Sequence, residues 1–386
     1  MAARRPFPAK SWAITVASIG AVVGLMLFQL LGLGREAAAA GGADLPRTLT
    51  IASIAYPYKG RQTYNGLNNT VIEQGWLKAE LARRGVRLVW FPVPTAIGGP
   101  LINEGFAGKR IDFAAYGDFP AIIANAGGVD ARLIVPMGRG QNSYLVVRNG
   151  LAATSIRDLK GKRIALHRGR PWELPFSKLL DANGLTLGDF QIVNINPNAA
   201  HAALASGDID AVFLLSDGIL LQKKGQGRII WSTKSAPADW KMRAELFGRK
   251  DFIDSQPGLT RLVAEAYVRA AHWSSLPGNR TRVIREAARG ETPVDVVEED
   301  YDDPRVTWRQ RFSPLFDAPV DDHYRSVADY TFANRLVRRK VDAKDLLDRR
   351  FVDAAIRDLG LDGYWQAQDR SAALSTPPSL RTQGAP

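Results

Sequence analysis

Two turns in this chain carry residues suited to binding a small anion. In the first turn, Gly117 and Asp118 follow a short apolar run, and Pro120 fits the first turn of a new helix. Backbone amides at a helix N-terminus lack intrahelical acceptors, so they can bind an anion or a polar group. In the second turn, residues 167–170 read His-Arg-Gly-Arg and supply two guanidinium groups, which pair well with oxyanions.

Other candidate ligand contacts lie where expected strands end or expected helices begin. Two tyrosines follow the first apolar strand, two glycines precede a helix, and an arginine and an asparagine lie beside the expected connection between two lobes. The predicted ligand-binding residues are Tyr56, Tyr58, Gly98, Gly99, Tyr116, Gly117, Asp118, Arg139, Asn142, His167, Arg168, Arg170, Trp172, Glu173 and Asp217.

Most of these residues also have a purely structural explanation, which the sequence leaves open. Asp118 would then cap the helix that follows it, and Glu173 would complement the dipole of another helix. The basic turn at 167–170 and Arg139 would be solvated, and the tyrosines would pack against neighbouring side chains.

The elements that position these residues alternate between strand and helix. Strands are expected at 49–54, 87–91 and 132–136, with a break at residues 56–58, and a helix is expected from Asn68 or Asn69 to Gly85. The helix after the first turn is expected at 121–126. Short Gly/Pro turns between alternating elements indicate parallel sheets covered by helices on both faces.

A partial repeat indicates a second lobe of the same class. The Ile-Asp-Phe step at 111–113 recurs as Ile-Asp-Ala at 209–211, about a hundred residues later. Strands are expected at 144–147, 163–166 and 191–194, with Pro171 at the first position of a helix. The strand at 229–231 is expected to cross back to the first lobe. The prediction is therefore two doubly wound lobes hinged around a central cleft.

We expect the first lobe to comprise residues 46–140 and 232–365, and the second lobe residues 141–231. Helical spacing of apolar residues predicts helices at 257–273, 326–336 and 346–359. Residues 366–386 are rich in polar residues and proline, and we expect a disordered tail there.

Composition excludes several chemistries. The chain has no cysteine, which rules out disulfides, thiolate metal sites and cysteine nucleophiles. The four histidines show no metal-ligand spacing, so neither a metal nor another cofactor is expected. The net charge of +12 comes from scattered arginines without interleaved aromatics, which argues against nucleic-acid binding.

The first forty residues have the features of an export signal. Arg4, Arg5 and Lys10 precede an apolar run at 12–33, and small residues at 37–41 suit a signal peptidase. The run could also span a bilayer, so a membrane anchor remains the alternative. In both cases the globular part is expected outside the inner membrane, in the periplasm.

Several of these segments, taken in order, resemble the periplasmic substrate-binding proteins of ABC importers of the nitrate/sulfonate/taurine group. The similar residues are those at 108–120, 155–165, 202–212, 271–273 and 341–350, and the resemblance covers most of 46–365. It implies a type II periplasmic-binding fold, no catalysis, and an inner-membrane permease with its ATPase as partners of a monomer.

Under this resemblance, the expected function is capture of a small organic anion, such as an aliphatic sulfonate, for import. The alternative is a membrane-anchored protein that senses its ligand. A third possibility is an enzyme like the thiamine-pyrimidine synthases, which share the fold. Those enzymes carry a cysteine-rich motif that this chain lacks.

Overall fold

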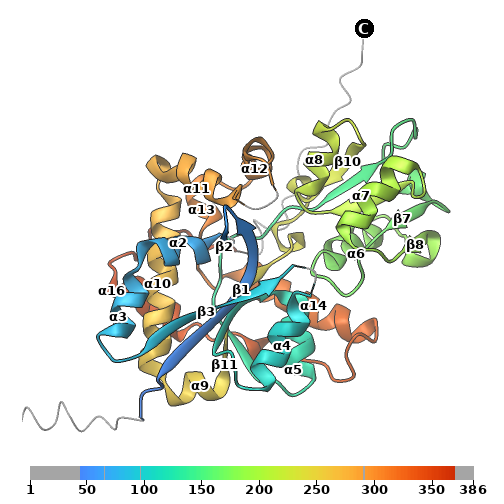
Figure 1. The fold of residues 1–386 in the computed structure, drawn as a ribbon. Coiled ribbons are helices and arrows are strands. Elements are labelled where there is room, and N and C mark those ends of the chain that lie inside the picture. Colours follow the sequence, from blue (N-terminus) through green and yellow to red (C-terminus); the bar gives the residue numbers. More distant parts are fainter. Residues whose placement is uncertain (1–43, 65, 96, 290–291, 370–386) are drawn as a thin grey trace, which may run out of the picture. The chain divides into compact units, whose positions relative to one another are not determined.

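The computed structural model describes residues 44–64, 66–95, 97–289 and 292–369. These residues form two β-sheets with helices packed against both (Figure 1). We call the first sheet and its helices the first lobe, and the second sheet and its helices the second lobe. The expected two-lobed α/β fold is confirmed. The predicted targeting segment, residues 1–40, lies outside the described residues.

The first sheet has six strands in the order β2-β1-β4-β11-β5, with β3 on the other edge of β1. Its strands are β1 (Thr48–Tyr58), β2 (Arg61–Tyr64), β3 (Arg87–Pro94), β4 (Phe113–Gly117), β5 (Ala131–Val135) and β11 (Ala244–Arg249).

The expected break of the first strand at residues 56–58 is wrong. Strand β1 continues to Tyr58 and turns back as β2, with Tyr56 opposite Thr63. The turn uses Lys59 and Gly60, both with positive φ, which allows a tight two-residue connection. Beyond Ala55 the strand pairs only with β2, so Pro57, which has no amide to donate, is tolerated there.

The expectation of parallel strands holds only in part. Strands β3 and β4 run parallel to β1, whereas β11 runs antiparallel to both β4 and β5. Strand β11 enters the sheet from the second lobe, so no crossover helix of this sheet sets its direction.

Side chains alternate along the strands and therefore face two layers of helices. In β4, Phe113 and Ala115 pack with one core, and Ala114 and Tyr116 pack with the other. The first core is covered by α2 (Leu67–Gln74), α3 (Trp76–Ala82), α10 (Pro257–Ser275) and α16 (Arg350–Asp358). The second core is covered by α4 (Gly99–Ala107), α5 (Asp118–Ala126) and α14 (Ala318–Ala333).

The second sheet has five strands in the order β10-β6-β9-β7-β8. Strands β7, β8 and β9 are parallel, and β6 is antiparallel to its neighbours. The expectation that residues 229–231 return to the first lobe is wrong, because β10 forms the edge of this sheet. The strands are β6 (Tyr144–Val147), β7 (Arg163–Ala165), β8 (Gln191–Val193), β9 (Ala211–Leu214) and β10 (Arg228–Ser232).

Helices α6 (Glu173–Asp181), α7 (Pro197–Ser206) and α8 (Asp217–Lys223) cover the second sheet, with a short 3-10 helix η1 at Ile156–Leu159. Pro171 lies two residues before α6 rather than at its first position, because the chain makes a turn from Arg170 to Glu173.

Several helix boundaries differ from the sequence expectations. The helix expected from Asn68 or Asn69 to Gly85 is two helices, α2 and α3, because Gly75 between them has a φ of 67°. Helix α5 begins at Asp118 rather than residue 121, and α14 begins at Ala318 rather than residue 326. The helix expected at 346–359 is two helices, because Leu347 to Arg349 interrupt it. The remaining helices are α9 (Lys250–Ser255), α11 (Arg280–Ala287), α12 (Val294–Tyr301), α13 (Trp308–Arg311) and α15 (Ala343–Leu346).

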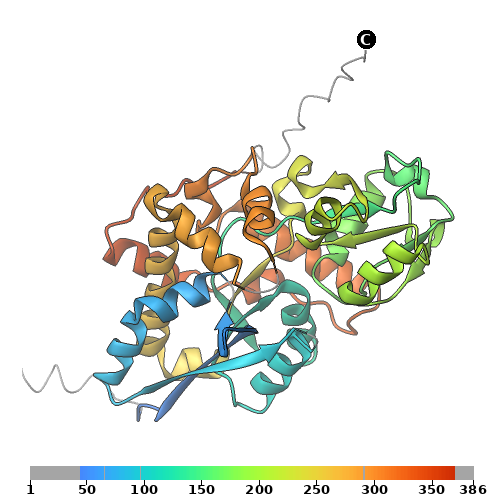
Figure 2. The ribbon, with the colours of Figure 1, turned by 45° about the horizontal axis from the view of Figure 1, so that its top comes forward.

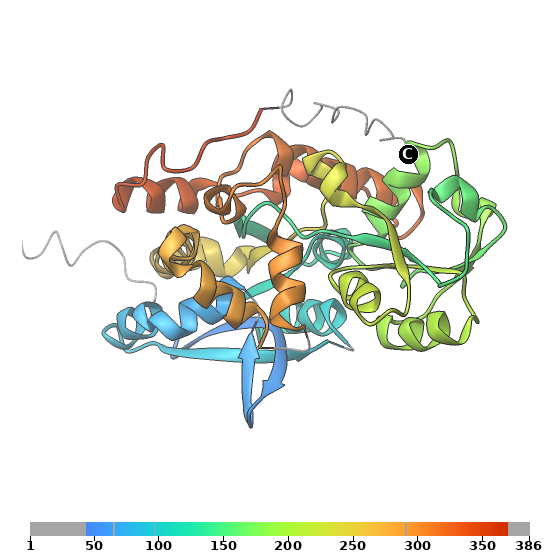
Figure 3. The ribbon, with the colours of Figure 1, turned by 90° about the horizontal axis from the view of Figure 1, so that it is seen from above.

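Two adjacent segments connect the lobes, before β6 and after β10 (Figure 3). They are joined by hydrogen bonds from Gln141 N to Met242 O (2.7 Å) and from Thr233 N to Ser143 O (3.0 Å). They are the connections at which the sequence leads us to expect a hinge.

Helix α12 follows α11 of the first lobe but packs against α8 of the second (Figures 1 and 2). Val296 is fully buried in the core of the second lobe, and Lys223 pairs with Asp295 and Glu299. This segment therefore makes an additional link between the lobes beside the hinge.

The first residues of the expected disordered tail make specific hydrogen bonds with the first lobe. Gln366 O accepts a hydrogen bond from Arg139, and Gln368 N donates one to Asp317. The rest of that prediction, residues 370–386, lies outside the described residues. In the part of the chain that the structure describes, the helices are too short or too polar to cross a membrane.

Candidate functional site

The two lobes meet at the turns that the sequence singled out. A Cβ atom added to Gly117, at the end of β4, would lie 2.5 Å from Cγ of Pro171 in the second lobe. A Cβ atom added to Gly98, just before α4, would lie 2.9 Å from Nη1 of Arg170. Glycine at both positions therefore lets the loop from His167 to Glu173 approach the first lobe closely.

The N-terminus of α4 is open toward this loop. Gly98 precedes the helix with φ of 62°, and no side chain caps it. In the described part of the chain, the amides of Gly99 and Leu101 donate to no acceptor outside the helix. Pro100 between them has no amide to satisfy. A helix N-terminus with free amides carries partial positive charge and favours an anion.

Arg170 adds a full positive charge next to these amides. Its side chain is half-buried, and among the described residues it makes no hydrogen bond or ion pair. Burial lowers the pKa of Arg170, because a guanidinium removed from water loses solvation. A partly desolvated cation without a partner is unusual in a folded protein, and it indicates a place where an anion binds.

The loop that carries Arg170 is fixed by Glu173, which is fully buried. Its carboxylate accepts from Arg168 Nε (2.7 Å), Gly169 N (2.6 Å) and the hydroxyl of Tyr330 in the first lobe (3.0 Å). Arg168 is therefore engaged by Glu173. The interaction with Tyr330 also joins the loop to α14 across the lobe boundary.

His167 and Trp172 both belong to this loop, and the centroids of their rings are 6.1 Å apart. The atoms His167 Nδ1 and Trp172 Nε1 are buried and have no partner among the described residues. Burial, together with the charge of Arg170, lowers the pKa of His167. The imidazole is therefore neutral near pH 7.

The first turn does not offer the free amides that the sequence predicted there. Asp118 N donates to Arg243 O, and Phe119 N donates to the carboxylate of Asp118 itself. That carboxylate also accepts from Arg243 N (3.3 Å) and faces His323 Nε2 (2.6 Å). Asp118 is fully buried, so it anchors the returning strand rather than facing the cleft.

Two further candidates are engaged on the hinge side of the molecule. Arg139 is buried and ion-paired with Asp317, with additional hydrogen bonds from Nη2 to Gln310 and Ser313. The amide of Asn142 donates to the backbone oxygen and the carboxylate of Asp300. Both side chains are therefore already paired within the protein, and we leave them out of the proposed binding site.

The other candidates are spread over separate places. Tyr116 packs in the core of the first lobe between Phe106 and Phe247, with its hydroxyl buried and unpartnered among the described residues. Tyr56 and Tyr58 lie in the β1–β2 hairpin, and the Tyr58 ring is exposed. Asp217 lies in the first turn of α8, which packs on β6 and β10. The proposed site therefore centres on Gly98, Gly99, Gly117, His167, Arg170 and Trp172.

Sequence reasoning missed a recess in the second lobe next to this loop. Besides His167 and Trp172, it is lined by Ala165, Ile195, Pro197, Ala200, Val212, Phe213 and Leu214. The space between these atoms, about 170 Å³, is too narrow to admit a water molecule in this conformation. It lies at the carboxyl ends of β7, β8 and β9, where open sheets bind ligands. The rule that ligands bind at the carboxyl ends of strands in open sheets could have predicted this recess from the sequence.

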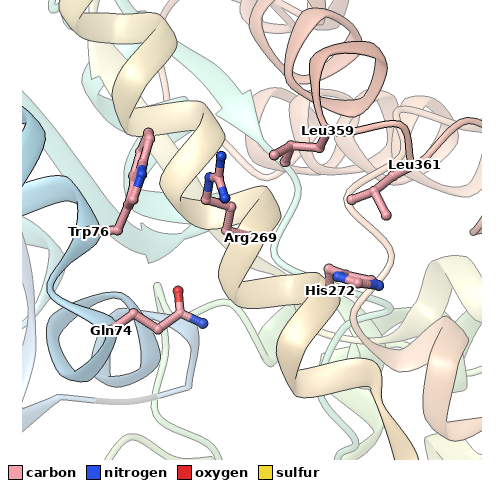
Figure 4. Close-up of a pocket in the computed structure, with 6 residues that line it drawn as sticks. All are labelled: Gln74, Trp76, Arg269, His272, Leu359 and Leu361. Carbon is pink, nitrogen blue, oxygen red and sulfur yellow. The ribbon is translucent and has the colours of Figure 1, made fainter.

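A hollow that is wide enough for water, with about 410 Å³ of accessible space, lies elsewhere on the first lobe (Figure 4). Trp76, Arg269 and His272 line it together with Gln74, Leu359 and Leu361. Arg269 lies over the Trp76 ring and is paired with Glu265, so its charge is already compensated. None of its lining residues belongs to the loop between the lobes.

Comparison with known proteins shows similarity to one family of binding proteins. Residues 104–275 match the family model described as NMT1/THI5 like. A solved structure of a putative periplasmic sulfonate-binding protein, SsuA, of a sulfonate ABC transporter from Methylobacillus flagellatus KT is 44% identical. The alignment covers 84% of this chain and 98% of that one, with a TM-score of 0.79.

More distant relatives carry similar names. A putative aliphatic sulfonates-binding protein from Bacillus subtilis is 23% identical, with 74% of this chain and 83% of the relative aligned. The alkanesulfonate-binding protein SsuA from Xanthomonas axonopodis pv. citri, solved with bound MOPS, is 21% identical. That alignment covers 80% of this chain and 100% of that one, with a TM-score of 0.60.

These comparisons agree with the two-lobed α/β fold. At 44% identity over nearly the whole of the solved relative, the chain belongs to the NMT1/THI5-like substrate-binding proteins of ABC importers, in the sulfonate, taurine and nitrate group.

Proposed function

We propose that this protein binds an aliphatic sulfonate between its two lobes in the periplasm. It then delivers the sulfonate to an inner-membrane ABC permease with its ATPase. The observation that carries this proposal is the Arg170 guanidinium, half-buried without a partner among the described residues and adjacent to the N-terminus of α4. The names of the relatives support a sulfonate as the ligand class.

The sulfonate group would lie between Arg170 and the amides of Gly99 and Leu101. A sulfonate has three oxygens, so it can accept from a guanidinium and from a helix N-terminus at the same time. One set of donors belongs to each lobe. The anion therefore stabilises the state in which the lobes are together, and binding shifts the hinge equilibrium toward closure.

We propose binding without catalysis. Relatives that are 44% and 23% identical to this chain are named as binding proteins. Enzymes of this fold that resemble thiamine-pyrimidine synthases depend on a cysteine-rich motif, and this chain has no cysteine. Around Arg170, the polar groups are suited to holding an anion by hydrogen bonds and charge.

Calorimetry on the full chain with three matched solutes tests the proposal. Butanesulfonate, pentanoate and butyl methyl sulfone share a short alkyl chain but differ in the charge and geometry of the polar end. We expect tight binding of butanesulfonate, weaker binding of pentanoate and no measurable binding of the sulfone. A ligand that binds only the native state at 100 times its Kd should also stabilise it by about 2.7 kcal/mol. Equal binding of the uncharged sulfone would contradict the proposal.

A further inference from the structure

The first turn of α6 makes two contacts that cross the boundary between the lobes. Leu174 is 2% exposed and packs with the second core of the first lobe, although α6 belongs to the second lobe. The preceding residue, Glu173, is fully buried, and its Oε1 accepts a hydrogen bond from the hydroxyl of Tyr330 on α14 (3.0 Å). One turn of α6 thus presses an apolar and a charged side chain against the first lobe.

Tyr330 is held ready to donate to this carboxylate. Its ring packs against Phe119 of the first lobe, with centroids 5.7 Å apart, and Ser177, one turn further along α6, also interacts with its hydroxyl. Burial, followed by the charge of Glu173, raises the pKa of Tyr330, so the hydroxyl keeps its proton at neutral pH. Because the donor and the acceptor belong to different lobes, this hydrogen bond exists only while the lobes are together.

The Glu173 carboxylate connects this contact to the anion site. It also accepts from Arg168 Nε (2.7 Å) and Gly169 N (2.6 Å), which lie on the loop that carries Arg170. Hydrogen bonds to an ionised acceptor are stronger than those between neutral groups. Loss of the Tyr330 hydroxyl would leave the bonds within the loop intact. It would remove the bond that keeps the loop against the first lobe, opposite α4.

We propose that Tyr330 is a positioning residue for the anion site, which holds the loop of Arg170 opposite α4 through Glu173 before any ligand binds. Leu174 supports the same closed arrangement, because separation of the lobes would expose its side chain to water. The inference rests on the proposed function, in which Arg170 and the amides of α4 bind one sulfonate. Part of the ligand-free protein is then already closed, and the apparent affinity is reduced only by the fraction that is open.

Tyr330→Phe tests the inference, because it removes the hydroxyl and keeps the ring. Tyr364→Phe is the matched control, since the Tyr364 hydroxyl shares a hydrogen bond with Ser275 Oγ (3.0 Å) within the first lobe. The chain has no cysteine, so Ala107→Cys and Ala205→Cys, at exposed positions on α4 and α7, give one spin-label site on each lobe. In the labelled full chain, double electron–electron resonance measures the fraction at the distance seen with saturating butanesulfonate, the closed fraction. Calorimetry with butanesulfonate measures the Kd.

We expect a closed population in the ligand-free wild type and the same closed fraction and Kd in Tyr364→Phe. In Tyr330→Phe the closed fraction should fall and the Kd should rise by the same factor, up to about tenfold for one hydrogen bond to a carboxylate.

Three results would overturn the inference and leave the proposed function standing. They are a ligand-free wild type without a closed population, an unchanged Kd in Tyr330→Phe, and weaker binding by Tyr330→Phe at an unchanged closed fraction. The first of these does not depend on how the variants fold. The third would mean that the hydroxyl acts on the ligand itself rather than on the lobes. If the wild type does not bind butanesulfonate, the proposed function and the inference both fail.

Discussion

The two places where the lobes touch differ in how their polar groups are satisfied. On the hinge side, the Asp300 carboxylate accepts from Tyr144 Oη (2.6 Å) and from the amide of Asn142, and Lys241 pairs with Asp303. On the cleft side, Arg170 and Trp172 have no partner in the described part of the chain. The hinge-side charges named here have partners within the protein, although Arg139 Nε and Ser143 Oγ are buried without one among the described residues. On the cleft side, the charge of Arg170 itself has no partner among the described residues and needs a ligand.

Because of this difference, we expect the two contacts to affect different properties: protein stability on the hinge side and ligand affinity on the cleft side. A buried ion pair whose partners are both present is sensitive to loss of one member, because the other charge remains buried. A buried donor without a partner costs free energy until a ligand supplies an acceptor. We therefore expect hinge-side substitutions to lower the free energy of unfolding. Cleft-side substitutions that change only a contact between the lobes, or a contact to the ligand, should lower sulfonate affinity instead.

The largest expected effect on stability comes from Asp303→Asn. Lys241 and Asp303 are both buried, and burial lowers the pKa of Lys241. Removing the Asp303 charge leaves the ammonium group uncompensated and should cost about 3–5 kcal/mol in denaturant unfolding. Asp295→Asn is the control, because Asp295 pairs with Lys223 at the surface and should cost at most about 1 kcal/mol. Similar losses in both variants would contradict the account of the hinge side.

Glycine-to-alanine substitutions at two positions compare a contact within the first lobe with a contact between the lobes. Gly99→Ala brings a Cβ atom within 2.7 Å of Cγ of Pro120 in the same lobe, where helices α4 and α5 pack. That clash should cost about 1–3 kcal/mol of stability. Gly117→Ala meets Pro171 of the other lobe, and the lobes can relieve the clash by separating.

We therefore expect Gly117→Ala to lower sulfonate affinity several-fold with little change in Tm. Thermal melts and calorimetry on both variants check this difference. A Tm for Gly117→Ala as low as that for Gly99→Ala would mean that the lobe contact is part of the folded core rather than a closing cleft.

The smallest expected effect on stability is that of changing Asp210, which lies away from both lobe contacts, directly before β9. Hydrogen bonds from Arg163, and one more hydrogen bond from Arg148, lower the pKa of Asp210 from 3.8 to about 2. Because the folded pKa is depressed, the stabilisation is full above about pH 4 and is lost as pH falls toward 2. Asp210→Asn should therefore be less stable than the wild type at neutral pH, and the difference should vanish near pH 2.

The neighbouring Asp208 provides the control for this titration. It is exposed and accepts only from Ser206 among the described residues. Acid unfolding of Asp208→Asn should follow the wild type, as monitored by circular dichroism. A constant difference between Asp210→Asn and the wild type down to pH 2 would show that the carboxylate charge is not what stabilises β9.

Local patterns were sufficient to predict much of the fold. Apolar runs predicted the buried strands β4 and β6, and the glycines at 98 and 117 were correctly expected at turns. The direction of β11 could not be predicted, because it depends on the chain returning from the other lobe. The start of α14 was predictable, since Asp317 and Pro319 are typical of a helix N-terminus.

The binding site was harder to predict because arginines look alike in a sequence. Arg139, Arg168 and Arg170 were all candidate anion ligands. The partner of Arg139, Asp317, is 178 residues away, and Glu173 engages Arg168 only because the loop folds back on its helix. Only the packing of the lobes distinguishes Arg170, which is left without a partner among the described residues.

The central claim is that Arg170 binds the anion that closes the lobes. Calorimetry with butanesulfonate on the wild type, Arg170→Ala and Arg338→Ala tests it most directly, because Arg338 is an exposed arginine outside the site. Loss of a charge-assisted hydrogen bond should weaken binding by roughly ten- to a hundredfold in Arg170→Ala, with Tm unchanged or higher without ligand. Arg338→Ala should bind as the wild type does. An unchanged Kd in folded Arg170→Ala would contradict the account.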